Sequence, residues 1–215
     1  MAVSEEAIKE AVKKARESAH KRNFLESVDM IINVQDLDLA DPKNRFDIEV
    51  RLQHPTGKQM AICVIAEGDL AVRAQRAGVD LVIGRDDLEK LASNPKTLKN
   101  IADTHDFFVA AAPMMPLVGR FFGRVLGPRG KMPKPIPPNR DIEPIIARLR
   151  QSTRLRLRKS PTIHARVGTA DMKDDELNAN IDVVLTNLLE RFERGDQNIR
   201  SVYIKTTMGK PVKIR

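Results

Sequence analysis

The chain has 215 residues, 41% of them hydrophobic and 31% charged, which is typical of a folded globular protein and excludes a disordered or membrane-spanning one. Its net charge of +8 favours a polyanionic partner, whereas a single cysteine, Cys63, excludes an intrachain disulfide and a cysteine-based metal site. We expect Cys63, which lies in an apolar run, to be a small buried hydrophobic residue. The acidic, polar N-terminus predicts no secretory signal, so we expect a cytoplasmic protein without a membrane partner.

The positive charge is concentrated in one stretch of the sequence. Residues 118–159 contain twelve lysines and arginines against two acids, a balance of +10, while the rest of the chain holds 25 basic and 27 acidic residues, a balance of −2. No acid follows Asp196, but five basic residues do. Such clustering is typical of proteins that bind nucleic acids.

The N-terminal part predicts one helix and two half-buried strands. Residues 4–21 have apolar side chains at helical spacing, with Ser4 as the expected N-cap. Residues 27–33 and 46–52 alternate between apolar and polar side chains, a pattern that predicts strands with one buried face.

The middle of the chain has a different pattern. Residues 60–65 form a continuous apolar run, which predicts a strand covered on both faces. Further helices are predicted over residues 70–77, 86–92 and 141–151, and further strands over residues 81–83 and 107–111. This alternation of strands and helices predicts parallel βαβ units and therefore a small Rossmann-like α/β domain.

Half-buried strands return towards the C-terminus. Residues 154–158 and 162–167 alternate, and a helix is predicted from Asp174 to Phe192. In the last strand, residues 201–207, we expect Val202 and Ile204 to face inward. The N-terminal and C-terminal parts therefore share the same pattern of half-buried strands and amphipathic helices. We expect residues 1–59 and 156–215 to form a ferredoxin-like or RRM-like α+β domain with an antiparallel sheet, into which residues 60–155 are inserted as a Rossmann-like domain.

The outward face of the last strand carries hydroxyl groups, a phenol and an ammonium group. A solvated strand face is the ordinary interpretation, but such groups also bond to ribose and phosphate. Aromatic residues make up only 4% of the chain, so base stacking cannot dominate recognition. The candidate RNA-binding surface comprises Arg22, Asn23, Phe24, Glu26, His164, Arg166, Gly168, Ser201, Tyr203, Lys205, Thr207, Met208 and Gly209.

Residues 119–133 are rich in glycine, proline and basic side chains. They predict either a rigid loop or a loop that presents backbone N–H groups to an anion. The segment is no Walker loop, because Val125 and Met132 stand where a glycine and a Ser/Thr are required. We assign a secondary basic surface to Arg120, Arg124, Arg129, Lys131 and Lys134.

Catalytic patterns are not found in the sequence. The four histidines show no metal-ligand spacing, and no serine lies in a nucleophile elbow. We therefore predict a protein that is not an enzyme and that uses no cofactor or metal. The alternative is a nucleotide-dependent enzyme that uses the inserted α/β domain.

Four segments resemble a known family. These are Phe24 with its polar neighbours and residues 126–133, 163–168 and 201–209. Together they are similar to the L-one family of large-subunit ribosomal proteins in its archaeal form. One departure is that the family's proline usually follows the last glycine directly, whereas here Lys210 precedes Pro211.

The resemblance implies both an architecture and a function. It implies two domains with a hinge, the main RNA site on the terminal domain, and Thr207, Met208 and Gly209 as the central RNA-contacting triplet. It further implies a monomer outside the ribosome that binds large-subunit rRNA in the mobile stalk near the tRNA exit site and takes part in release of deacylated tRNA. Repression of its own mRNA is also implied, and a purely translational repressor would use the same surface.

Overall fold

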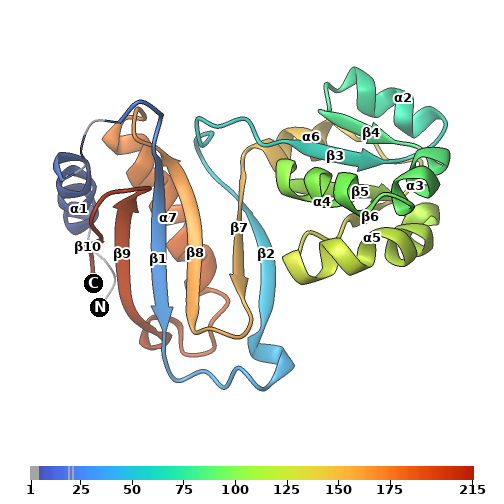
Figure 1. The fold of residues 1–215 in the computed structure, drawn as a ribbon. Helices are drawn as coiled ribbons and strands as arrows, with labels where there is room; N and C mark the ends of the chain where they lie inside the picture. Colours follow the sequence, from blue (N-terminus) through green and yellow to red (C-terminus); the bar gives the residue numbers. More distant parts are fainter. Residues whose placement is uncertain (1–4, 19, 21) are drawn as a thin grey trace. The chain divides into compact units, whose positions relative to one another are not determined.

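The chain forms two compact units. The computed structural model describes residues 5–18, 20 and 22–215, so the N-cap predicted at Ser4 lies outside the described part. One unit, here called the terminal unit, combines both ends of the chain up to Lys58 and from Gln151 onward, and the inserted unit is Gln59–Arg150 (Figure 1). The predicted boundary after residue 155 falls inside a strand, Ser152–Leu157, that lies wholly in the terminal unit.

The terminal unit contains two antiparallel sheets. Strands β10, β9, β1 and β8 form one sheet in that order, and β2 pairs with β7 in the other. The elements are α1 (Glu5–Glu17), β1 (Ser27–Val34), β2 (Phe46–Arg51), β7 (Ser152–Leu157), β8 (Thr162–Thr169), α7 (Asp174–Leu189), β9 (Ile199–Thr206) and β10 (Val212–Lys213), with short 3-10 turns at Pro42–Asn44 and Gly195–Asn198.

Helices α1 and α7 cover one face of the four-stranded sheet, and α7 lies behind β1 and β8 in Figure 1. The predicted alternation is confirmed, because the inward side chains of β1 (Val28, Met30 and Ile32) are at most 2% exposed. They pack with helix residues such as Ile8 and Ile181 in one core. Helix α1 ends at Glu17, earlier than predicted, because Ala15 is the last α1 residue buried in this core.

The inserted unit contains a parallel sheet with the strand order β4-β3-β5-β6. Every residue of β3 and β5 is buried, since helices lie on both faces (Figure 1). The predicted combination of antiparallel and parallel sheets is thus confirmed. The elements are β3 (Ile62–Ile65), α2 (Asp69–Arg76), β4 (Leu81–Ile83), α3 (Arg85–Ala92), α4 (Pro95–Thr104), β5 (Phe107–Ala111), α5 (Met115–Arg129), β6 (Lys134–Ile136) and α6 (Glu143–Arg150), with a 3-10 turn at Ala112–Met114.

The structure of the inserted unit differs from the prediction at two places. The polar stretch before residue 107 contains α4, whose N-cap Asn94 accepts a hydrogen bond from the Thr97 N–H. The expected loop at residues 119–133 is instead mostly helix α5, which continues to Arg129 and ends at Gly130 with a left-handed φ of 69°. Both predictions for this segment, a rigid loop and a loop that presents backbone N–H groups to an anion, are therefore wrong.

Packing explains why α5 forms despite its glycines. Val118, Phe122 and Leu126 recur every four residues and are fully buried. Burying each of these side chains stabilises the fold by about 1.5–3 kcal/mol, whereas each of the three helical glycines costs about 1 kcal/mol. The burial outweighs the poor helix propensity. None of the helices in the described part of the chain is long and apolar enough to cross a bilayer.

Candidate nucleic-acid interface

The face of the four-stranded sheet opposite α1 and α7 presents polar side chains in rows. Asp29 of β1 lies opposite Arg166 on one side and Lys205 on the other, and Ile31 lies opposite His164 and Tyr203. Residues paired in this way point to the same face. We name this surface the open sheet face, and it comprises Asp29, Ile31, Asn33, Thr162, His164, Arg166, Ser201, Tyr203, Lys205 and Lys213.

Asp29 is the central acid of the open sheet face and was not predicted. Burial raises the pKa of its carboxyl, and the charges of Arg166, Lys205 and His164 partly offset this rise. No hydrogen bond or ion pair joins its carboxylate to another described residue. Asp29 occupies an outward position of the strand predicted at residues 27–33, so the alternation of that strand could have identified it.

The turn after β9 is held in place by hydrogen bonds to the start of β1 and within the turn itself. The Thr207 hydroxyl accepts from the Ser27 N–H at 3.0 Å, and the Thr207 N–H donates to the Ser27 carbonyl at 3.0 Å. Glu26 Oε1 accepts from the Met208 N–H at 3.1 Å, and Lys205 Nζ donates to the Thr207 carbonyl at 3.1 Å. The Thr207 hydroxyl and the buried Glu26 therefore shape the turn, and they fix the position of Met208.

Two predicted contact glycines have a packing role inside the terminal unit. A Cβ at the buried Gly168 would lie 2.5 Å from Leu177 Cδ2 and 2.6 Å from Met172 Sδ. A Cβ at Gly209 would lie 2.3 Å from the buried hydroxyl of Thr206. Glycine at these positions allows close packing within the unit.

Three large apolar side chains are exposed near the end of the sheet. Phe24 is 54%, Leu25 53% and Met208 62% exposed. The hydrogen bond between Glu26 and Met208 brings the two segments together. Leu25 was not predicted, although its position between Phe24 and Glu26 made it a candidate.

The remaining predicted residues of the terminal unit divide into exposed and buried ones. Arg22 and Asn23 are exposed in the segment before β1, and His164 is exposed on β8. Ser201 is only 7% exposed, because its hydroxyl accepts from Asn33 Nδ2 at 2.9 Å. Arg166 is half-buried, and its Nε has no hydrogen-bond partner among the described residues.

The five residues predicted to form a secondary basic surface differ in their exposure and in their hydrogen bonds. Arg120 and Arg124 are exposed on α5, and Lys134 is exposed on β6. Arg129 instead forms two hydrogen bonds with Asp103, at 2.9 and 3.2 Å. Lys131 Nζ donates to the carbonyls of Ala102 and His105 at the end of α4, so it acts as a helix cap.

The basic stretch of the sequence is also divided between the two units. The inserted unit holds 14 basic and 10 acidic residues, which gives +4, and subtraction from the totals of 37 and 29 leaves 23 and 19, again +4, for the terminal unit. In the terminal unit, Arg154 and Arg158 both bond to Asp47. Charge alone therefore favours neither unit as the nucleic-acid site.

Two further features concern metal binding and the single cysteine. No group of His, Cys, Asp or Glu side chains within residues 5–18, 20 and 22–215 could hold a metal ion. Burial raises the pKa of the Cys63 thiol to about 12, so the thiol stays protonated and unreactive at neutral pH. Cys63 is fully buried, which confirms it as a small hydrophobic residue of the core.

Comparison with known proteins identifies the family. A large ribosomal subunit protein uL1 from Methanothermobacter thermautotrophicus is 50% identical over 210 residues, which cover 98% of this chain and 99% of the relative. Proteins of the same name from Thermococcus kodakarensis and Pyrococcus horikoshii are 45% and 46% identical, and the matches cover 100% of this chain and 99% and 98% of the relatives. The profile of the ribosomal protein L1p/L10e family matches residues 12–210. The predicted resemblance is confirmed: the chain belongs to this family of ribosomal proteins, which are not enzymes.

Proposed function

We propose that the protein is a structural constituent of the large ribosomal subunit in the cytoplasm and that it binds rRNA through the open sheet face and the adjoining turn. The observation that supports this most directly is that Arg166, Lys205 and His164 surround Asp29 on a sheet face that α1 and α7 leave uncovered. The relatives are named as proteins of the large ribosomal subunit. The terminal unit would act as an RRM-like RNA reader and the inserted unit as a Rossmann-like domain.

In this proposal each group has a defined chemical role. Arg166 and Lys205 contact phosphates, and Tyr203 bonds to ribose or phosphate through its phenol. The exposed side chains of Phe24 and Met208 pack against sugars or bases. Glu26, Gly168, Ser201, Thr207 and Gly209 position these groups through the internal contacts described above, and Arg22 and Asn23 lie in the segment that carries Phe24.

The larger role follows from the family and is part of the same proposal. The protein would form the mobile stalk near the tRNA exit site and take part in the release of deacylated tRNA. Arg120 and Arg124, exposed on α5, are the candidates for contact with a passing tRNA. The same open sheet face would bind an rRNA-like structure in the protein's own mRNA, and outside the ribosome the protein would be a monomer.

Met208→Asp tests the RNA site. An acid at this exposed position should weaken binding to a large-subunit rRNA fragment by about 1–3 kcal/mol, the cost of one specific contact, with little change in stability. The measurement is filter binding at fixed salt. Met132→Asp is the matched control, because Met132 is also an exposed methionine, at 39%, but lies in the inserted unit. Equal affinities of the two variants would contradict the site.

Co-sedimentation with large ribosomal subunits tests the structural role. The unaltered protein should sediment with the subunits, and Met208→Asp should be depleted from that fraction. A protein that binds its own mRNA but never sediments with subunits would instead be a translational repressor alone.

A further inference from the structure

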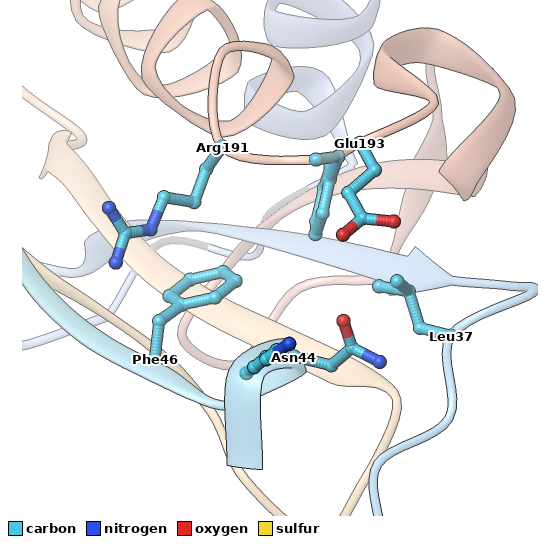
Figure 2. Close-up of a pocket in the computed structure, with 7 residues that line it drawn as sticks. Leu37, Asn44, Phe46, Arg191 and Glu193 are labelled. Carbon is cyan, nitrogen blue, oxygen red and sulfur yellow. The ribbon is translucent and has the colours of Figure 1, made fainter. Parts of the chain in front are cut away.

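A small pocket lies in the terminal unit (Figure 2), and none of its lining residues belongs to the open sheet face. It is formed by the loop after β1, the start of β2 and the segment after α7. Its volume is about 80 Å³, and its lining residues are Leu37, Lys43, Asn44, Phe46, Arg191, Phe192 and Glu193. Sites for drug-sized ligands occupy roughly 300–1,000 Å³, whereas one water needs about 10–15 Å³. The pocket is therefore suited to one nucleobase rather than to a whole nucleotide.

Two phenylalanines form the apolar base of this pocket. Phe46 and Phe192 are 8% and 6% exposed, and their ring centroids lie 6.0 Å apart at an interplanar angle of 59°. Their contact belongs to the core of the terminal unit, which holds the pocket in one shape. A planar ligand would lie against one of the two rings, because rings tilted by 59° cannot both face it.

The rim of the pocket carries charged groups of both signs. Lys43, Arg191 and Glu193 are exposed, and their charged ends form no ion pair or hydrogen bond with another described residue. Asn44 donates through Nδ2 to the Asp38 carbonyl at 2.8 Å, which leaves its Oδ1 as an acceptor. Figure 2 shows Glu193 and Asn44 on one side of the pocket and Arg191 on the other, beside Phe46. Acceptors and donors thus flank the apolar base on opposite sides.

We propose that this pocket binds the base of an unpaired guanine in RNA. Guanine offers adjacent N–H donors at N1 and N2 on one edge and acceptors at O6 and N7 on the other. Glu193 and Asn44 accept from the N–H edge, and Arg191 donates to the acceptor edge. Lys43, an exposed lining residue, contacts the attached phosphate. Adenine and uracil each lack the pair of adjacent donors, so they fit this arrangement less well.

The pocket and the open sheet face share no residue, so the two proposals stand independently. The pocket uses residues 37–46 and 191–193, whereas the open sheet face uses outward positions of β1, β8, β9 and β10. Guanine binding would give the terminal unit a second, base-specific contact with RNA.

Nuclear magnetic resonance with GMP as the probe tests this proposal on the full chain. GMP should shift the backbone amides of Lys43, Asn44, Arg191 and Glu193, with a Kd on the order of 1 mM, because one small ring provides little binding free energy. AMP and UMP should bind at least about fivefold more weakly, given that a good pair of base contacts discriminates by 1–3 kcal/mol. Equal shifts with AMP or UMP, or the same shifts with inorganic phosphate alone, would overturn the proposal.

Glu193→Gln distinguishes hydrogen bonding from simple charge. This change removes a negative charge near the phosphate, so electrostatics alone would tighten GMP binding. Loss of the carboxylate, which shares the N–H edge of guanine with Asn44, should instead weaken binding by about tenfold. Glu190→Gln is the matched control, because Glu190 is an exposed acid of the same segment that does not line the pocket, and it should leave GMP binding unchanged.

Met208→Asp separates this proposal from the main RNA site. The variant should bind GMP as the unaltered protein does, even though its affinity for the rRNA fragment falls. Tighter or unchanged GMP binding by Glu193→Gln would overturn the guanine site without affecting the open sheet face.

Discussion

The two units carry the same net charge, but only the terminal unit leaves a sheet face open. In the inserted unit, β3 and β5 are buried on both faces, and Arg129 and Lys131 bond to neighbouring groups of the unit. In the terminal unit, α1 and α7 cover one face, and Arg166, Lys205 and His164 line the other. The candidate interface therefore rests on an uncovered sheet face more than on the number of charges, because the inserted unit also has exposed arginines, Arg120 and Arg124.

Matched double neutralisations test this comparison most strongly. Arg166→Gln with Lys205→Gln should lower the affinity for the rRNA fragment by roughly thirtyfold or more, since two phosphate contacts at about 1–3 kcal/mol each are lost. Arg120→Gln with Arg124→Gln removes the same charge from α5 and should cost less than about fivefold, through the general field alone. Filter binding at several salt concentrations measures both. If the α5 pair costs as much, the inserted unit shares the RNA site.

Two glycine substitutions test whether close packing is confined to the terminal unit. Gly168→Ala should destabilise that unit by about 1–3 kcal/mol, because the added methyl meets the buried tip of Leu177. Gly123→Ala on α5 should stabilise the inserted unit by about 0.5–1 kcal/mol, since open space surrounds the position and alanine favours helix. Hydrogen exchange of amides in β8 and α5 reports the two units separately. Unchanged protection in β8 would show that the packing around Gly168 yields to the methyl.

Removal of Asp29, the central acid of the open sheet face, should give the smallest of these effects. The sign of the change in stability follows from the pKa of its carboxyl. Burial raises the pKa of Asp29 above its usual value of 3.8, so the folded state binds this proton more tightly than the unfolded state. The contribution of protonated Asp29 to the free energy of unfolding is complete below pH 3.8, and it is lost as the pH rises through the folded-state pKa of this carboxyl. Asp29→Asn should therefore stabilise the terminal unit at pH 7, and this gain should shrink as the pH falls towards 4.

Urea unfolding across this pH range measures the effect of Asp29→Asn. Glu67→Gln, which removes an exposed acid of the inserted unit, should show no such pH dependence. A stability gain for Asp29→Asn that stays constant down to pH 4 would mean that burial of the carboxylate is not its cause.

Much of the candidate site could be predicted from the sequence, because strand alternation is a local pattern. The outward positions Tyr203 and Lys205 follow from the alternation of one strand, and the structure leaves both half-buried on the open sheet face. Asp29 and Asn33 were missed although the same rule applies to β1. Ser201 and Glu26 were predicted as contacts, but their burial depends on partners 168 and 182 residues away in the chain. No local pattern contains those partners.

The sequence by itself determined the spacing of apolar residues along the helices and strands, and with it the contrast between a sheet covered on one face and a sheet covered on both. It also determined the family. Tertiary structure decided which polar groups remain available. It buried Glu26 and bonded its carboxylate to the Met208 N–H, bonded Thr207 to Ser27, and directed Arg129 and Lys131 to α4. It also formed α5 from a glycine-rich segment. The physical reason is the same in each case: propensity and periodicity act over a few residues, whereas burial and hydrogen bonding depend on groups that only the folded chain brings together.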